Sequence, residues 1–481
     1  MKELIEIELN ELIKKIITTK AEFQTVEIKK ALDGTPAKLY DTLSSFSNQD
    51  DGGIIIFGID EKNGFDICGV YDVQNLQKKV MEQCNQMEPI IRAVFTHTEI
   101  EGKSVVSAEI PPVDITMRPC FYAAKGRLKG SYIRVGDADI PMTEYEVYSY
   151  EAYRKKYQDD IREVPRATKE TINFVALEKY LLQLKENRPN FSNLSDKQIM
   201  ELSSITHNEH FTLTSVLLFS ICPQIFFPQF SIIATVVPGT EMGDIDEFGY
   251  RFKDNKRIEG TIPEMLNGAL SFIKNNMRTK VTIEDGIRND KTEYPINSLR
   301  EIILNALVHR DYSIHTEGMP IQLTIYSDRL EIKNPGGLYG RLTLDTLGKV
   351  QPDTRNPILA TALETIKITE NRYSGIPTIR REVKEWGLPE PEFRNERGVF
   401  SVCLRKSIVA NYNSNDISRL ILEFCKIPRT RKEIAEFLRF KSETYVINKY
   451  VKPLIEKQLI TLSIPDKPSS SKQKYTVSDK V

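Results

Sequence analysis

The chain has 481 residues, of which 40% are hydrophobic and 28% charged, and its formal net charge is −1. This length exceeds what one hydrophobic core supports, so we expect a multidomain α+β protein of ordinary globular composition. No apolar run is long enough for a membrane helix, and the amino terminus lacks the apolar core of a signal peptide, which predicts a cytoplasmic protein without a membrane partner. The six cysteines are scattered without a Cys-x-x-Cys pair, which argues against a disulfide framework and a zinc site.

The first 150 residues predict an α+β domain. Apolar residues recur at helical spacing over residues 1–20, and the apolar run 54–57 predicts a strand entered through two glycines. Residues 104–110 and 131–135 predict further strands. A charged segment, residues 153–170, then predicts a linker or connecting helix.

Acidic side chains cluster in this first domain. Glu27 and Lys29 alternate on a predicted strand and would share one face, Glu22 precedes them, and Asp60 and Glu61 follow the strongest strand. Carboxylates from separate elements, together with a lysine, are typical of a metal-dependent phosphodiester-cleaving site. Glu22, Glu27 and Asp60 are its candidate Mg²⁺ or Mn²⁺ ligands. The structural alternative is a solvated strand edge, where alternating charges are routine.

A longer motif surrounds these acids: Glu22-x4-Glu27-x-Lys29, Ser45-Phe-Ser-Asn48, Gly52-Gly53, Gly69-Val70 and Tyr132-Ile-Arg-Val-Gly136. In this pattern the segment resembles the Schlafen AlbA_2 domain. In nucleolytic members of this family, three acids of the motif form the active site. The resemblance implies that Glu22, Glu27 and either Asp60 or Glu61 occupy these positions here. Other members of the same fold are described as DNA-binding proteins or regulators, so cleavage and binding both stay open.

Residues 298–309 predict an amphipathic helix. Glu301, Asn305 and His309 follow at i, i+4 and i+8 and share a stripe beside the apolar face. The amide oxygen of Asn305 can ligate Mg²⁺, and the carboxylate of Glu301 can orient or deprotonate a water molecule. Ser298 and Glu301 also fit a capping box, which would give the glutamate a structural role.

Two further segments complete this candidate site. A strand over residues 329–337 ends in a glycine turn with Asn334, Gly336 and Gly337, where backbone can approach a ligand closely. Arg355 and Asn356 precede Pro357 at the start of a helix, and helix amino termini can hold phosphate through their N–H groups. The glycine segment alone could also be an ordinary turn.

The order of these motifs resembles the RecG-like (divergent AAA) family, whose nucleotide domain is a GHKL-type α/β sandwich. The resemblance implies ATP and Mg²⁺ as cofactors. By this resemblance, Glu301 and Asn305 would bind the metal ion and the attacking water. Asn334, Gly336 and Gly337 would lie against the base of the nucleotide. Arg355 and Asn356 would lie near the nucleotide. Where the family has a Gly-Thr-Gly-Ile string, this chain has residues 369–376 with only Gly375 retained, and Tyr373 and Ser374 add side chains. We therefore expect ATP binding rather than efficient hydrolysis.

His309-Arg310-Asp311 also matches part of a protein-kinase catalytic loop. That interpretation fails because Thr316 stands where such a loop needs asparagine, and no kinase glycine-rich loop accompanies it.

The last segment, residues 411–481, carries 14 Lys and Arg against 8 Asp and Glu, a local net charge of +6. Helices over 417–426, 431–438 and 442–457, followed by strands over 459–462 and 474–477, predict a winged helix-turn-helix. Its third helix would present five side chains to DNA: Lys441, Ser442, Thr444, Tyr445 and Lys449. A winged helix used for protein contact is the alternative.

Four segments follow from these patterns: an AlbA_2-like domain (1–150), a mixed connecting region (151–290), a GHKL-like ATP-binding domain (291–407) and a winged helix (411–481). We expect an ATP-binding, nucleic-acid-binding regulator of transcription controlled by nucleotide, with DNA as partner and RNA as the alternative. A Schlafen-like nuclease in defence or stress response is the second hypothesis, and a scaffold that has lost nucleotide binding is the third. The sequence leaves a homo-oligomeric state open.

Overall fold

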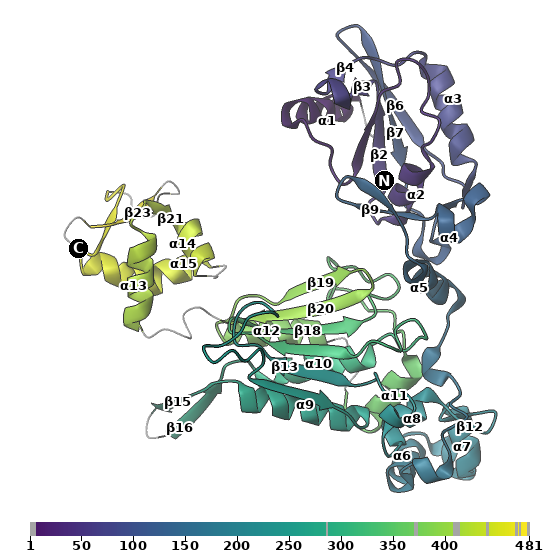
Figure 1. Cartoon of the computed structure of the whole chain (residues 1–481), viewed down its shortest axis with the longest axis vertical. Coiled ribbons are helices and arrows are strands. Elements are labelled where there is room, and N and C mark those ends of the chain that lie inside the picture. The colour runs from purple at the N-terminus through teal and green to yellow at the C-terminus, as the bar shows by residue number, and fades with distance from the viewer. Residues whose placement is uncertain are drawn as a thin grey trace. The chain divides into compact units, whose positions relative to one another are not determined.

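A computed structural model describes residues 6–284, 287–369, 374–406, 414–438, 442–466, 470 and 473–478. The chain divides into two compact units, Met1–Tyr157 and Gln158–Val481, which are described separately (Figure 1). Within these described residues, no helix combines the length and apolar character needed to cross a membrane.

The first unit is built on a four-stranded mixed sheet in the order β1-β2-β7-β6. Strand β1 runs parallel to β2, and the other pairs are antiparallel. Strands alternate their side chains between two faces, so neighbours such as Val105 and Val106 enter different cores. Helix α1 covers one face, and α2 and α3 cover the other (Figure 1). The bounds are α1 Glu6–Thr19, β1 Val26–Lys29, α2 Tyr40–Asn48, β2 Gly53–Phe57, α3 Val73–Cys84, β6 Val94–Ile100 and β7 Lys103–Ile110.

Several shorter strands and helices complete the first unit. The antiparallel hairpin of β9 and β10 packs against α2, and helix α5 begins with a capping box in which Thr143 and Glu146 satisfy each other's backbone N–H groups. The charged segment after α5 is irregular apart from short 3-10 turns. The bounds are β3 Ile59–Asp60, β4 Asp66–Ile67, β5 Met87–Glu88, β8 Phe121–Tyr122, α4 Gly126–Gly130, β9 Tyr132–Val135, β10 Ala138–Pro141 and α5 Glu144–Lys155.

The second unit contains a six-stranded sheet in the order β14-β13-β17-β18-β20-β19. Only the β13–β17 pair is parallel among these strands. Helix α9 packs on β13 and β14, while α10 packs on β18 and contacts both α9 and α12. The bounds are β13 Ile232–Val236, β14 Asp254–Ile258, α9 Ile262–Asn276, α10 Ile296–Val308, β17 Ile321–Ile325, β18 Arg329–Pro335, α12 Gly375–Glu385, β19 Glu392–Glu396 and β20 Val399–Arg405.

One continuous core joins this sheet to a helical group that precedes it. Buried residues from Val164 to Leu404 form a single cluster. The sheet takes β13 and β14 from the segment we expected to be a separate connecting region, so the two predicted segments share one sheet and one core. The remaining elements are α6 Phe174–Asn187, α7 Asp196–Leu202, β11 Thr206–His207, β12 His210–Phe211, α8 Leu213–Phe219, the hairpin β15 Thr279–Glu284 and β16 Ile287–Thr292, and α11 Pro357–Thr365.

The carboxyl-terminal residues have a hydrophobic core of their own, which extends from Ile417 to Tyr475. Its described residues form three helical segments and a three-stranded antiparallel sheet in the order β21-β23-β22, in which the short strand β21 lies between the first and second segments. The third segment widens to a π turn over Ile447–Val451, because Pro453 has no N–H to donate to the carbonyl of Lys449. The bounds are α13 Ser414–Phe424, β21 Arg429–Thr430, α14 Arg431–Phe437, α15 Glu443–Val446, α16 Lys452–Glu456, β22 Ile460–Leu462 and β23 Lys474–Val477.

Candidate functional site

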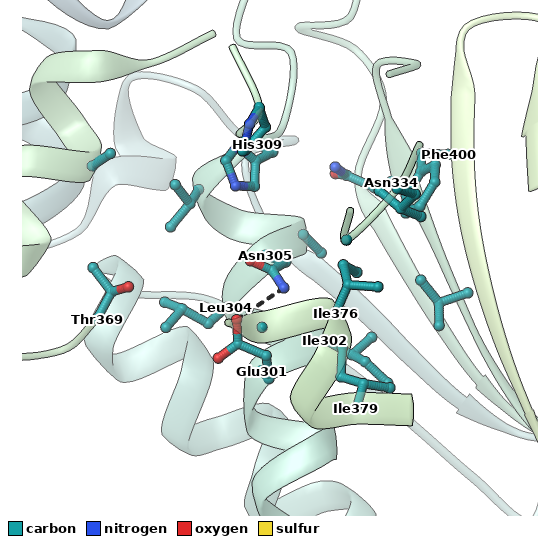
Figure 2. Close-up of a pocket in the computed structure, with 18 of the residues that line it drawn as sticks. Glu301, Ile302, Leu304, Asn305, His309, Asn334, Thr369, Ile376, Ile379 and Phe400 are labelled. Carbon is teal, nitrogen blue, oxygen red and sulfur yellow. Dashed lines mark hydrogen bonds between the residues drawn. The ribbon is translucent and has the colours of Figure 1, made fainter. Parts of the chain in front are cut away.

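A cavity of about 580 Å³ lies beside α10, between β18, α12 and the loop that joins β18 to α11. Its size suits a nucleotide-sized ligand. Figure 2 shows Glu301, Asn305 and His309 along one helix, with Asn334 and Phe400 on the strands beyond. Seven of the residues that we expected at a nucleotide site line this cavity: Glu301, Asn305, Asn334, Gly336, Gly337, Arg355 and Gly375.

Glu301 and Asn305 lie one helical turn apart, inside α10. The Asn305 amide donates a hydrogen bond of 3.1 Å from Nδ2 to Oε1 of Glu301 (Figure 2). The helix begins at Ile296, after Pro295, so Ser298 and Glu301 do not form a capping box. Ser298 instead donates to Oε2 of Glu382 at 2.9 Å. Glu301 is therefore an interior helical residue whose carboxylate faces the cavity.

Gly375, the first residue of α12, packs directly on this pair. A Cβ atom at Gly375 would lie 2.0 Å from Oε1 of Glu301 and 3.2 Å from Nδ2 of Asn305. A side chain there would have to displace the Glu301 carboxylate, so the glycine leaves room for this pair. Ser374 also lines the cavity, whereas Tyr373 lies outside the described residues.

The glycine turn after β18 closes another wall. Gly336 has a φ of +105°, and a Cβ there would lie 2.9 Å from the backbone nitrogen of Asp311. Gly336 is thus required by the packing of the turn itself. The Asn334 side chain is buried, and its Oδ1 has no hydrogen-bond partner among the described residues. In Figure 2 its amide points away from Phe400, toward the side of His309.

Arg355 and Asn356 differ in their placement. Arg355 lines the cavity, forms an ion pair with Asp311 and donates to the Gly337 carbonyl oxygen at 3.2 Å. Asn356 is fully buried outside the cavity lining. Its Nδ2 donates to the carbonyl oxygens of Val308 and Arg310, both at 2.8 Å. Asn356 holds the end of α10 in place and is not positioned to touch a ligand in the cavity.

The expected phosphate-binding amino terminus of α11 is already occupied. Oδ2 of Asp160 accepts hydrogen bonds from the backbone nitrogens of Ile358 at 2.8 Å and Leu359 at 3.2 Å. A carboxylate at this end also suits the helix dipole. Because these N–H groups serve the cap, our prediction that they hold phosphate was wrong.

The His309-to-Tyr312 motif is largely structural. The Arg310 guanidinium is buried and donates to the carbonyl oxygens of Asp311, Thr316 and Met319, and it lies over the ring of Phe230. The Tyr312 hydroxyl donates to the Leu307 carbonyl oxygen at 2.8 Å. These bonds fold the segment that follows α10 back onto the core.

Two cationic residues of the cavity escaped the sequence analysis. Arg300 and Lys367 both line it, and Arg300 donates from Nη2 to the Ile368 carbonyl oxygen at 2.6 Å. Arg300 could have been suspected from its place next to Glu301. Lys367 carries no sequence signal, because only the end of α11 brings it to the cavity.

In the first unit, the acidic cluster surrounds Arg134. Its Nη1 lies 2.8 Å from Oε2 of Glu27 and 3.0 Å from Oδ1 of Asp139, and its Nη2 lies 3.6 Å from Oε2 of Glu22. Lys29 forms an ion pair with Glu27, as the alternation on β1 predicted. The guanidinium, only 1% exposed, therefore occupies the centre of the carboxylates.

The other two acids of the predicted nuclease site form no ion pair with Arg134 among the described residues. Asp60 pairs with Lys30 at 3.4 Å, and Glu61 is exposed. Burial raises the pKa of Glu22 to about 7, the charges of Glu27 and Glu61 add to the rise, and the Ile28 N–H and Arg134 oppose it. Within the parts of the chain that the structure describes, no three His, Cys, Asp or Glu side chains are placed to hold a metal ion. The predicted metal ligands Glu22, Glu27 and Asp60 thus do not fit an ion in this arrangement.

Four of the five expected nucleic-acid contacts lie exposed on the third helical segment of the carboxyl-terminal core. Ser442 caps α15 by accepting from the Tyr445 nitrogen at 3.3 Å. Lys449 donates to the Tyr445 hydroxyl oxygen at 2.6 Å and lies over the rings of Tyr445 and Tyr450. Thr444 is exposed beside them, and Lys441 lies outside the described residues.

Three family models match parts of the chain. Residues 22–143 match the family described as "Schlafen, AlbA_2", and residues 318–404 match "Putative ATP-dependent DNA helicase recG C-terminal". Residues 415–478 match "Filamentation induced by cAMP protein Fic-like, C-terminal domain". Two regions of the chain are therefore similar to the Schlafen AlbA_2 family and to the RecG-like carboxyl-terminal family, which confirms the resemblance seen in the motifs. The third match was not foreseen.

Solved structures show weaker similarity. A crystal structure of a Corynebacterium diphtheriae protein aligns at 17% identity and a TM-score of 0.39, over 98% of this chain and 97% of that one. The amino-terminal domain of a RecG-related protein from Nitrosomonas europaea aligns at 23% identity and a TM-score of 0.23, over 28% of this chain and 92% of that one. No curated protein matches.

Proposed function

We propose that this chain binds ATP with Mg²⁺ in the cavity beside α10. The observation that carries the proposal is the Glu301–Asn305 pair, which sets a carboxylate and an amide 3.1 Å apart on the cavity wall. Mg²⁺ in nucleotide sites is held by one or two protein oxygens together with phosphates and water, and these two side chains fit that role. The bound ion would neutralise phosphate charge. The match of residues 318–404 to the RecG family supports the same conclusion.

The rest of the cavity suits the other parts of a nucleotide. Ile302, Ile332, Ile379 and Val402 make an apolar wall in which Asn334 is the buried amide, an arrangement that fits a purine ring with polar edges. The hydrogen bond from Asn305 holds one oxygen of the Glu301 carboxylate, and Gly375 leaves room for it. We propose binding as the main activity of the GHKL-like region, with slow hydrolysis at most.

The test is thermal unfolding of the whole chain with and without MgATP. A ligand at about 100 times its dissociation constant should stabilise the wild type by about 2.7 kcal/mol. Asn305→Ala should lose this stabilisation while the melting temperature without ligand stays unchanged. If ATP, ADP and their analogues leave the wild-type melting curve unmoved, the proposal fails.

We further propose that the two terminal regions bind nucleic acid and that nucleotide state alters this binding, as in a transcriptional regulator. The exposed Tyr445 and Lys449 on a locally basic region support a DNA contact, in the manner of a winged helix. For the AlbA_2 region we propose binding rather than cleavage, because Arg134 already neutralises Glu22 and Glu27.

A Schlafen-like nuclease remains the second candidate, supported by the AlbA_2 match and the convergence of Glu22 and Glu27. It is tested by incubating tRNA, single-stranded RNA and DNA with Mg²⁺ or Mn²⁺, with and without ATP. Cleavage by the wild type that Glu27→Gln abolishes would establish the nuclease. Binding without cleavage, unchanged or tighter in the same variant, would establish the binding module.

A further inference from the structure

Lys367 occupies a backbone position that favours glycine. It follows the end of α11 with a φ of +59°. Its backbone nitrogen donates to the Glu364 carbonyl oxygen, and the Ile368 nitrogen donates to that of Leu363, both at 2.9 Å. This closing turn is the helix-ending motif in which glycine adopts left-handed backbone at little cost and a side chain does not. Lys367 thus adopts a backbone conformation that glycine would adopt at lower cost.

The turn brings Lys367 to the polar end of the cavity. Its side chain is exposed and lines the same space as Glu301 and Asn305, and no ion pair joins it to another described residue. Arg300, next to Glu301 on α10, holds the turn through its bond of 2.6 Å to the Ile368 carbonyl oxygen. Figure 2 shows Thr369, two residues beyond Lys367, on the Glu301 side of the cavity and far from Asn334.

We propose that Lys367 binds the terminal phosphate of a nucleoside triphosphate and so makes the site prefer triphosphates to diphosphates. The inference rests on the proposed ATP binding and adds a residue and a specificity to it. If the base lies against the apolar wall near Asn334, the phosphates extend toward Glu301, Asn305 and Lys367. An ammonium group is a compact, flexible point charge that suits a terminal phosphate. The structural alternative is that Lys367 only complements the dipole at the end of α11.

The substitution Lys367→Gly separates the two roles because it should move stability and binding in opposite directions. Glycine relieves the left-handed backbone, so the melting temperature without ligand should stay level or rise by roughly 2 °C. Loss of a hydrogen bond to a charged group should weaken MgATP binding roughly 10- to 100-fold. The affinity for MgADP, which lacks the terminal phosphate, should change little, and Lys367→Arg should keep most of the ATP affinity.

Lys156 offers a matched control. It is an exposed lysine that follows helix α5 with a φ of +53° and does not line the cavity. Lys156→Gly should affect stability as Lys367→Gly does, while the affinities for ATP and ADP stay at wild-type values. Calorimetric titration of the full chain with each nucleotide gives these affinities.

Two results would overturn the inference while the proposed function stands: wild-type ATP affinity in Lys367→Gly, or an equal loss of ATP and ADP affinity. Wild-type ATP affinity would mean that Lys367 only complements the dipole at the end of α11. An equal loss of ATP and ADP affinity would mean that Lys367 does not contact the terminal phosphate. Absence of nucleotide binding by the wild type would instead remove the proposed function and the inference together.

Discussion

Oδ2 of Asp160 accepts a hydrogen bond of 2.8 Å from the backbone nitrogen of Ile358, nearly two hundred residues further along the chain. Asp160 is the third residue of the second compact unit, and Ile358 is the second residue of helix α11, which follows Arg355 of the cavity wall. The segment that leaves the first unit is thereby fixed to the helix beside the proposed nucleotide site.

Asp160 should make stability depend on pH in an unusual direction. Burial raises its pKa from 3.8 to about 6, against the two N–H bonds that lower it. The native state therefore holds this proton more tightly than the unfolded state, so the stabilisation is complete below about pH 4 and is lost as pH rises through 6. We expect a loss of roughly 2–3 kcal/mol from this group over that interval. Asp160→Asn cannot titrate and should show a flatter profile; parallel wild-type and variant profiles in urea unfolding would contradict the assignment.

Gly336→Ala should destabilise the second unit. Alanine at a φ of +105° is strained, and its Cβ would lie 2.7 Å from the Cβ of Asp311 and 2.9 Å from its nitrogen. Together these effects should cost about 2–4 kcal/mol. The control is Gly318→Ala, where a Cβ would meet nothing within 4 Å and the change should stay within about 0.5 kcal/mol. Equal melting temperatures for the two variants would mean that the turn accommodates a side chain.

Arg134→Met should destabilise the first unit strongly. Methionine fills a similar volume but leaves the buried carboxylate of Glu27 and the partly buried carboxylate of Asp139 without their shared cation, a loss of about 3–5 kcal/mol. Arg127→Met is the matched control, because its partner Glu151 is partly exposed and such a pair contributes at most about 1 kcal/mol. Chemical unfolding of the full chain measures both. Similar small losses would show that the carboxylates find water or protonate instead.

The contrast between Glu301 and Asn356 shows what sequence reasoning could reach. Glu301 and Asn305 share a helix, so the 3.6-residue period alone places both on one stripe, and the structure confirms that placement. Strand β2 was likewise evident from a short apolar run. Asn356 follows a motif residue that does reach the cavity, yet its side chain turns to the carbonyl oxygens of Val308 and Arg310. Its direction depends on tertiary packing, which no local pattern encodes.

Long-range partners account for most of the other differences. Asp160 caps α11 across a large stretch of sequence, so the occupied helix terminus was invisible beforehand. Arg134 belongs to the AlbA_2 motif, but only the fold brings hairpin β9–β10 against β1 and puts the guanidinium among the acids. Strand β13 pairs in parallel with β17, so the sheet runs through a boundary that composition had suggested near residue 290. Parallel pairing needs a long crossover, and its strands leave no hairpin signal.

The last prediction concerns duplex DNA. If the segment of α15 and α16 enters a major groove, Lys449 is placed to meet phosphate, because it is exposed and hydrogen-bonded to Tyr445. Lys449→Ala should then weaken binding to duplexes of any sequence and reduce the slope of log K against log salt by about 0.9.

Lys432 on α14 is the control for this prediction, being exposed and paired with Glu436 at 3.9 Å. Lys432→Ala removes the same charge from another helix and should leave the salt slope unchanged. Fluorescence anisotropy at several salt concentrations measures both slopes. Equal reductions would show that only the general positive charge of this region attracts DNA. If the salt slope falls in neither variant, a protein partner is favoured for this region. A basic module that enters a DNA groove is expected to neutralise phosphates, and the slope would then fall.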